Sequence, residues 1–281
     1  MRIAIIGSNG FIGSNLFNYF NKKKNIKIKK MPAYSKNKNW VNLVCESISS
    51  FTPNIIINCS ASQNLLDNKK AINDLIASNI YAQCCFLSEA KKNKNFIGYV
   101  TFGSKWEYDQ KGGYSPNSFY AATKFSMDYF LKYFSNRKLA TVSLKIFDTY
   151  GENDPRKKIY NLLLKSYKKK KLLKLTPGKQ ELDYVNIKDL CEAVNLACKY
   201  IVSKKIIGFK KYTISSKKPI TIKKFVKILK QELKNKLNIK LGAIKYRNNE
   251  SMKSLKKIFN IPGWKPRVNF ISETKKIFDK Q

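Results

Sequence analysis

The sequence contains no histidine, and this absence removes several kinds of active site. A Ser-His-Asp triad, a Cys-His pair and an imidazole metal site all need the missing side chain. Any group that gives or takes a proton must therefore be a tyrosine, a lysine, a cysteine or a carboxylate.

Other features are also missing. The six cysteines never occur in a CxxC spacing, so we expect no zinc and no other metal site. No apolar run approaches the ~18 residues that span a bilayer. A strand-like run begins at Arg2, and no signal-peptide pattern precedes it. These absences predict a cytoplasmic protein that does not enter a membrane.

Acidic residues are few: 18 Asp and Glu stand against 56 Lys and Arg, a formal charge of +38. Such an excess fits a polyanionic partner or a compositional bias toward Lys, Asn and Ile. Nearly all the positive charge is lysine, whereas base readout and bidentate phosphate binding favour arginine. We therefore favour the bias and expect no nucleic-acid partner. With 281 residues, 43% of them hydrophobic, the chain is long enough for one large core or two joined ones.

Strand-like and helix-like patterns alternate through the first half. Apolar runs indicate strands at 3–6, 26–31, 54–58, 96–102 and 140–147, and helical periodicity indicates helices at 13–22, 69–91 and 120–134. This order predicts an α/β fold with a Rossmann doubly wound parallel sheet. The second half is less regular, with helices at 158–169, 187–201 and 222–237 and a short strand at 211–214. We predict a Rossmann domain over 1–150, a return segment near 183–205, and a smaller α/β substrate-binding domain over 151–182 and 206–281.

A glycine motif joins the first strand to the first helix. Gly7 allows a tight turn, Gly10 lets the backbone approach a pyrophosphate, and Gly13 lets helix and strand pack closely. The helix N-terminus then faces the phosphates. The candidate cofactor-binding residues of this motif are Gly7, Asn9, Gly10, Phe11, Ile12 and Gly13.

The end of the second strand bears on the choice of cofactor. A carboxylate there would bond a ribose 2′-hydroxyl and select NAD. This chain instead has Lys29, Lys30, Ser35 and Lys36, which suit a 2′-phosphate. We therefore predict NADP, with Lys30 as a contact, and keep NAD as the alternative.

Tyr120 and Lys124 are spaced to share one face of a helix. As a cation, Lys124 is expected to lower the pKa of the Tyr120 phenol, with help from an oxidised nicotinamide. The phenol then exchanges a proton with a substrate hydroxyl while hydride moves. Ser104, expected just past the strand that ends near Phe102, is placed to bond the same oxygen.

These features resemble the extended short-chain dehydrogenase/reductases of the NAD-dependent epimerase/dehydratase family, in the branch that acts on nucleotide sugars. The resemblance extends through "IINCSA" at 56–61, "SNIYA" at 78–82, "FDTYGENDP" at 147–155, "LDYVNIKDLCEAV" at 182–194 and "GWKP" at 263–266. Within that branch the segment 241–252 is most similar to nucleotide-sugar 4-ketoreductases.

The resemblance implies roles for individual residues. It makes Ser104, Tyr120 and Lys124 the catalytic set, with Ser104 also contacting substrate and Lys124 also holding the nicotinamide ribose. It places Asn42 near the adenine, Ser60 and Ala61 along the cofactor, Asn79 as an orienting residue and Arg247 at the substrate diphosphate. It also implies a homodimer formed through the helices at 69–91 and 120–134.

Departures from the family pattern disfavour some of the reactions that the family catalyses. Lys105 and Trp106 follow Ser104, where 4,6-dehydratases carry an acidic pair. Without histidine a 3,5-epimerase is disfavoured, and Asp148 replaces an Asn common in 4-epimerases. We therefore predict reduction of a nucleotide-linked 4-keto-6-deoxy sugar. A 4-epimerase that keeps NAD bound stays open, as does a non-catalytic Rossmann protein that binds a nucleotide or RNA.

Overall fold

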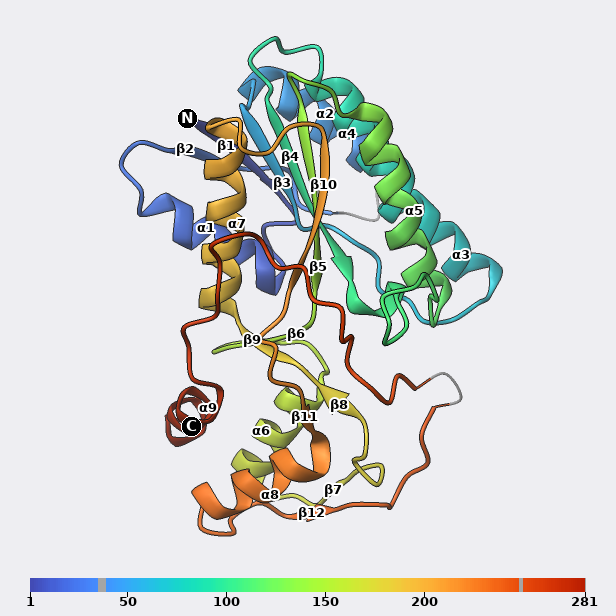
Figure 1. The fold of residues 1–281 in the computed structure, drawn as a ribbon, viewed down its shortest axis with the longest axis vertical. Helices are drawn as coiled ribbons and strands as arrows, with labels where there is room; N and C mark the ends of the chain where they lie inside the picture. Colours follow the sequence, from blue (N-terminus) through green and yellow to red (C-terminus); the bar gives the residue numbers. More distant parts are fainter. Residues whose placement is uncertain (35–38, 248–249, 281) are drawn as a thin grey trace.

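A six-stranded parallel sheet forms the centre of the molecule (Figure 1). The computed structural model describes residues 1–34, 39–247 and 250–280. The strand order is β10-β5-β4-β3-β1-β2. The strands are β1 (Arg2–Ile6), β2 (Lys27–Lys30), β3 (Ile55–Asn58), β4 (Gly98–Ser104), β5 (Ala140–Ile146) and β10 (Phe209–Ile214).

The inner strands are apolar because helices cover both faces of the sheet. Every residue of β3 is buried, and its sequence is a continuous Ile-Ile-Ile-Asn run. One face packs against α1 (Phe11–Asn21) and α7 (Ile187–Val202). The other packs against α2 (Trp40–Phe51), α4 (Ala82–Ala90) and α5 (Phe119–Phe134). This is the doubly wound architecture that the sequence predicts.

The helix expected over 69–91 contains a wider turn. α3 (Lys69–Ile76) runs through a π-helical turn, Ala77–Tyr81, into α4. The π turn packs against α5 and buries Asn79 completely. The Asn79 side chain, in the middle of this long helix, therefore reaches Thr123 on α5.

β10 differs from its assignment in the sequence analysis. The sequence pattern predicts that 206–281 belong to the smaller domain, but β10 pairs in parallel with β5 as an edge strand of the main sheet. Its sequence, FKKYTI, carries two exposed lysines, so it lacks the apolar run of the inner strands. The chain returns again further on, because Trp264 is buried in the main core and its indole N–H donates to the Asp189 carbonyl.

A smaller lobe lies beyond the carboxyl ends of the strands (Figure 1). Its core is a cluster of aromatic rings that includes Tyr160, Tyr184, Phe225 and Phe270. The helices are α6 (Ile159–Lys169), α8 (Ile222–Glu232) and α9 (Phe270–Asp279). Three short strand pairs join them: β6 (Asp148–Tyr150) with β9 (Tyr184–Asn186), β7 (Leu173–Lys174) with β12 (Ile239–Lys240), and β8 (Glu181–Leu182) with β11 (Ile220–Thr221).

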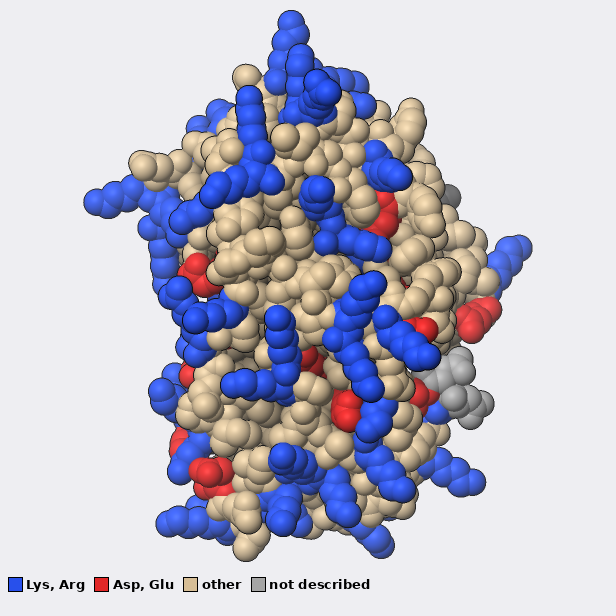
Figure 2. Space-filling model, viewed as in Figure 1, with Lys and Arg blue, Asp and Glu red and all other residues tan. Residues whose placement is uncertain are grey.

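Lysine and arginine side chains spread over the whole visible face in Figure 2. They cover both the sheet-bearing part and the smaller lobe and do not gather into one patch. This even distribution is typical of a compositional bias. Within the described residues, no helix is long and apolar enough to cross a membrane.

Candidate active site

The glycine motif forms a tight turn between β1 and α1. Gly7 has a φ of 73°, and a Cβ there would lie 2.6 Å from the Ser60 nitrogen. A Cβ on Gly13 would lie 2.2 Å from the Gly7 carbonyl oxygen, so helix and strand touch there. Gly10 is different: its nearest neighbour would be the Gly7 oxygen at 3.5 Å. The open side of the turn therefore lies at Gly10, where the sequence analysis expects the pyrophosphate.

The N-terminus of α1 suits an anion. α1 begins at Phe11 after Gly10, and among the described residues no side chain caps its first turn. Asn9 and Ile12 flank the same turn. Uncapped N–H groups at a helix N-terminus bind phosphate, so these residues fit the pyrophosphate of a dinucleotide.

The loop after β3 lies against this turn. Ser60 donates its N–H and its hydroxyl to the Asn58 side chain, at 3.0 and 2.6 Å. Ala61 follows and is exposed. Asn79 bonds Ser62 in the same loop and donates to the Thr123 hydroxyl on α5, 3.1 Å away. The loop after β3 is thereby tied to α5, the helix that carries Tyr120 and Lys124.

Lys30 and Asn42 lie on elements that follow the glycine turn in chain order, Lys30 on β2 and Asn42 on α2. Lys30 ends β2, opposite Ile5 of β1, and its ammonium lies 4.4 Å from the centre of the Phe17 ring. Asn42 is exposed in the first turn of α2, and its amide donates to Asn39 at 2.7 Å. Of the other residues expected to favour NADP, Ser35 and Lys36 lie outside the described residues.

Ser104 is the last residue of β4, two residues beyond the expected strand end. Its hydroxyl accepts the Trp106 N–H at 3.2 Å, which starts the short 3-10 helix η2 (Lys105–Glu107). It lies opposite Ile146 of β5, at the edge where the parallel strands end. Ser104 thus sits at the mouth of the sheet, the region in which open α/β sheets bind ligands.

Tyr120 and Lys124 occupy the first two turns of α5, which Ser118 caps by accepting the Ala121 N–H. Both side chains are buried, at 8% and 5% exposed. The rings of Tyr120 and Trp106 meet edge to face at 6.2 Å. Ser104, Trp106 and Tyr120 all line one cavity.

The pKa of Tyr120 moves opposite to the sequence expectation. Burial, together with the negative charge of Glu107, raises the pKa of the phenol above its usual value. Burial also lowers the pKa of Lys124 to about 8, against an opposing effect from Glu107. In the protein without cofactor, Tyr120 is therefore a protonated phenol, suited to donate its proton.

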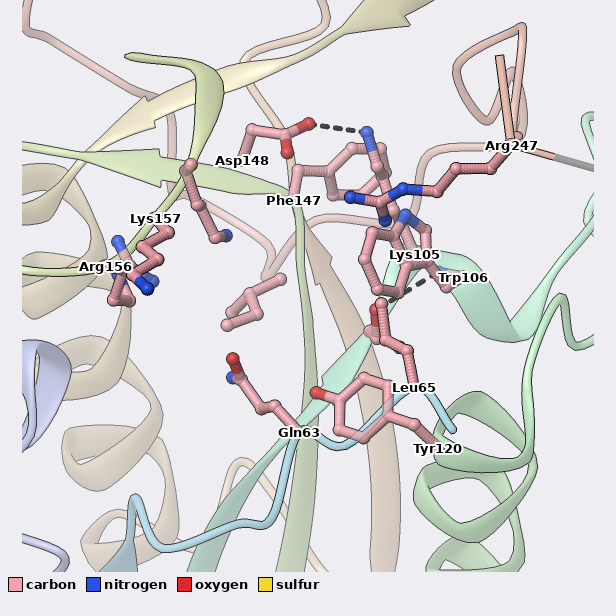
Figure 3. Close-up of a pocket in the computed structure, with 13 residues that line it drawn as sticks. Gln63, Leu65, Lys105, Trp106, Tyr120, Phe147, Asp148, Arg156, Lys157 and Arg247 are labelled. Carbon is pink, nitrogen blue, oxygen red and sulfur yellow. Dashed lines mark hydrogen bonds and ion pairs between the residues drawn. The ribbon is translucent and has the colours of Figure 1, made fainter. Parts of the chain in front are cut away.

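The cavity has a volume of about 300 Å³ and lies between the sheet edge and the smaller lobe (Figure 3). The Tyr120 hydroxyl points into it beside Gln63, and Arg247 reaches across it from the opposite side. Its cationic side chains are Lys105, Arg156, Lys157, Lys158 and Arg247. Asp148 is the one carboxylate among the residues that line it.

The negative charge of Asp148 is compensated by neighbouring lysines. Lys105 forms an ion pair with it, drawn as a dashed line in Figure 3. Burial raises the pKa of Asp148, but Lys105 and Lys158 outweigh burial and hold that pKa below its usual range. Burial lowers the pKa of Lys158 to about 8. The cavity as a whole stays cationic, which favours an anionic ligand.

Sequence reasoning missed several of these residues. Arg156 stacks on the Phe11 ring at 4.5 Å and also forms an ion pair with Asp154. It therefore joins the cofactor turn to the cavity. Gln63 and Lys158 enter the cavity from loops that follow β3 and β6. The signal that finds such residues is their position just after a strand of the parallel sheet.

An α/β enzyme that uses a dinucleotide is the class that this fold and this site define. The family model for the NAD dependent epimerase/dehydratase family matches residues 3–208, so the chain belongs to that family, as its motifs predicted. CDP-abequose synthase of Yersinia pseudotuberculosis is 30% identical over 274 residues, which cover 90% of this chain and 91% of that protein. The chain is thus an NAD-dependent enzyme of the sugar-nucleotide reductase and epimerase class.

Solved structures share the fold over the whole chain. UDP-glucose 4-epimerase of Thermotoga maritima, in a structure with UDP-glucose, matches with a TM-score of 0.83 at 17% identity, covering 100% of this chain and 99% of that one. UDP-glucuronic acid 4-epimerase of Bacillus cereus, in a complex with UDP-glucuronic acid and NAD, matches with a TM-score of 0.82 at 17% identity, covering 99% and 98%.

Two alanine substitutions separate cofactor binding from packing. Gly10→Ala adds a methyl to the open side of the turn, so we expect normal thermal stability but about tenfold or greater loss of NAD(P) affinity. Gly13→Ala drives a Cβ into the Gly7 carbonyl and should lower stability itself. Calorimetric titration and thermal unfolding measure the two effects. Unchanged affinity in Gly10→Ala would contradict the assigned phosphate position.

The lowered pKa of Lys124 makes stability depend on pH. In the folded protein the ammonium is penalised below pH about 8, and the penalty disappears as pH rises from about 8 to 10.5, where the unfolded chain also loses the proton. Lys124→Met should therefore raise the free energy of unfolding at pH 7 by up to about 3 kcal/mol. The gain should shrink above pH 8. Denaturant unfolding across this range tests it, with the exposed Lys132→Met on the same helix as the control.

Proposed function

We propose that this enzyme reduces a nucleotide-linked 4-keto-6-deoxy sugar, with Tyr120 as the proton donor. The observation that carries the proposal is the Tyr120 phenol, which burial keeps protonated and which points into a cavity lined by lysine and arginine. A carbonyl that accepts hydride at carbon needs a proton at oxygen, and a protonated phenol supplies it. The phenolate left behind regains its proton from solvent.

The other site residues assist this step. The Ser104 hydroxyl, at the end of β4, bonds the carbonyl oxygen beside Tyr120. Lys124 holds the nicotinamide ribose and stabilises the phenolate that forms. Gly7, Gly10 and the N-terminal turn of α1 hold the pyrophosphate. The nicotinamide, when bound, supplies the hydride.

The cationic cavity supports a diphosphate-linked substrate. Arg247 and Lys157 lie at its surface, where a diphosphate enters, and a guanidinium suits bidentate contact with phosphate. The name of the Yersinia relative supports a cytidine diphosphate carrier. Lys105 follows Ser104 and forms an ion pair with Asp148, so no acidic pair stands there for a dehydration.

We also propose NADP as the cofactor. Lys30 ends β2 beside the glycine turn, where a 2′-phosphate would lie, and within the described part of that strand end no carboxylate opposes it. The smaller lobe supplies the substrate contacts.

The described cysteines are free thiols, which supports a reducing cytoplasm as the compartment.

Tyr120→Phe should abolish turnover and leave cofactor affinity within about twofold of wild type, because only the proton donor is lost. The assay follows NADPH and NADH absorbance in parallel with CDP- and UDP-linked 4-keto-6-deoxy sugars, and mass spectrometry identifies the products. Wild-type turnover by Tyr120→Phe would sink the mechanism. Conversion of a 4-hydroxy sugar without net NADPH consumption would instead identify a 4-epimerase. RNA binding at physiological salt without turnover would identify a non-catalytic protein.

Exposed aromatic residues on α5 support a homodimer. Tyr129 and Tyr133 are 68% and 81% exposed, and Ile76 and Tyr81 on the adjoining α3 and π turn are exposed as well. Buried against a second copy, these side chains would form a helical interface. We expect sedimentation to show a dimer and Tyr129→Glu to give a monomer. Leu172→Glu, an exposed apolar position on the smaller lobe, is the control and should stay dimeric.

A further inference from the structure

Three charged side chains, Lys145, Glu107 and Asp128, are buried together behind the catalytic residues and next to Lys124. Lys145 on β5 is fully buried, and its ammonium lies 2.6 Å from Glu107 and 2.8 Å from Asp128. Glu107 belongs to η2, the turn after Ser104, and Asp128 lies one turn beyond Lys124 on α5. The two lysines and two carboxylates cancel formally, so the cluster adds no net charge to the interior.

Glu107 connects this cluster to the strand end that carries Ser104. One of its oxygens accepts the Ser104 backbone N–H at 2.6 Å, while the other accepts from Lys145. A Cβ on Gly103 would lie 2.5 Å from Glu107 Oε1 and from the Lys145 side chain. The carboxylate is therefore pressed against the β4 backbone, where any shift of it displaces Ser104.

The two carboxylates differ in their relation to Tyr120. Glu107 acts on both Tyr120 and Lys124, raising the pKa of each. Asp128 has a resolved effect on Lys124 but not on Tyr120. Lys145 faces the same lysine from β5, and Cys59 faces it from the end of β3. On the cavity side the charged groups are Lys105, Asp148, Arg156, Lys157, Lys158 and Arg247.

We propose that Glu107 is a positioning residue for the reduction: clamped by Lys145, its carboxylate fixes the Ser104 backbone and sets a negative charge against the Tyr120–Lys124 pair. Its role rests on the proposed function and deepens it: the carboxylate holds Ser104 at the strand end, keeps the phenol protonated before substrate binds, and keeps Lys124 cationic, ready to stabilise the phenolate. Lys145 serves as the clamp, and Asp128 completes the neutralisation of Lys145. A purely structural ion cluster would hold the elements together without distinguishing Glu107 from Asp128.

The matched pair Glu107→Gln and Asp128→Asn tests this distinction. Each variant removes one of the two carboxylates on Lys145, but only Glu107→Gln removes the charge that acts on Tyr120. The readout is NMR titration of protein labelled with 13C at the tyrosine Cζ, without cofactor or substrate, with Tyr120→Phe assigning the resonance. We expect Tyr120 to titrate about one pH unit lower in Glu107→Gln and as in wild type in Asp128→Asn.

A second variant covers the case in which Glu107→Gln does not fold. Glu107→Gln with Asp128→Asn and Lys145→Met removes all three charges of the ion cluster, which proteins often tolerate, and should lower the Tyr120 titration in the same way. The proposal is wrong if Tyr120 titrates alike in wild type and in the variants that lack Glu107, or stays protonated in all of them across the stable pH range. It is equally wrong if Asp128→Asn shifts Tyr120 as far as Glu107→Gln.

The experiments can contradict the proposed reaction and the role of Glu107 independently of each other. The NMR titration needs no turnover, so a lowered Tyr120 titration in Glu107→Gln stands even if no 4-keto sugar is reduced. Conversely, NADPH consumption by wild type, together with an unchanged titration, supports the reaction and removes Glu107 from it. In an active enzyme, Glu107→Gln should lower kcat with little change in KM, because the carboxylate holds the Ser104 backbone and keeps Lys124 cationic but contacts no substrate.

Discussion

The parallel alignment of the six strands is the constraint on which the site depends. Because all six strands point the same way, their carboxyl ends meet at one edge, and residues from several of the loops that leave this edge meet at the site. The glycine turn follows β1, the Ser60 loop follows β3, Ser104 ends β4, and the residues after β5 and β6 line the cavity. Asn79, on the π turn, then links the loop after β3 to α5 through hydrogen bonds to Ser62 and Thr123.

The buried lysines of this chain differ in their role from the many exposed ones, which reflect its composition. Most of its lysines lie in solvent and spread over the surface, where each has little effect on the fold (Figure 2). Lys145 is withdrawn from water and bonded to carboxylates, whereas burial lowers the pKa of Lys124 and Lys158. Desolvating an ammonium is costly, so each of these three requires a compensating neighbour or a chemical role. The excess of positive charge in the sequence hides this difference, and burial reveals it.

The sequence was informative where chemistry is local along the chain. The glycine spacing and the Tyr120–Lys124 pair each lie within one turn and one helix, so their geometry follows from the residues between them. Glu107 and Lys145 are separated by 38 residues and meet only because β4 pairs with β5. No periodicity predicts such a contact. For the protein without cofactor, the expected direction of the Tyr120 pKa was wrong because the Tyr120–Lys124 spacing reveals neither the burial of the phenol nor the nearby charge of Glu107. The sequence did not place β10 in the main sheet, because an edge strand with exposed lysines lacks the apolar run of an inner strand.

The path of the chain between the sheet and the smaller lobe has a mechanical consequence. The lobe is assembled from separate segments, and between them the chain goes back to form α7, β10 and the Trp264 contact before α9 closes the aromatic core. Several covalent connections thus run side by side across the junction. Parallel tethers resist the wide opening that a single linker permits and leave small sliding movements. Because several chain segments join the two halves of this molecule, we expect the cavity between them to change shape by sliding of packed elements and not by rotation about one hinge.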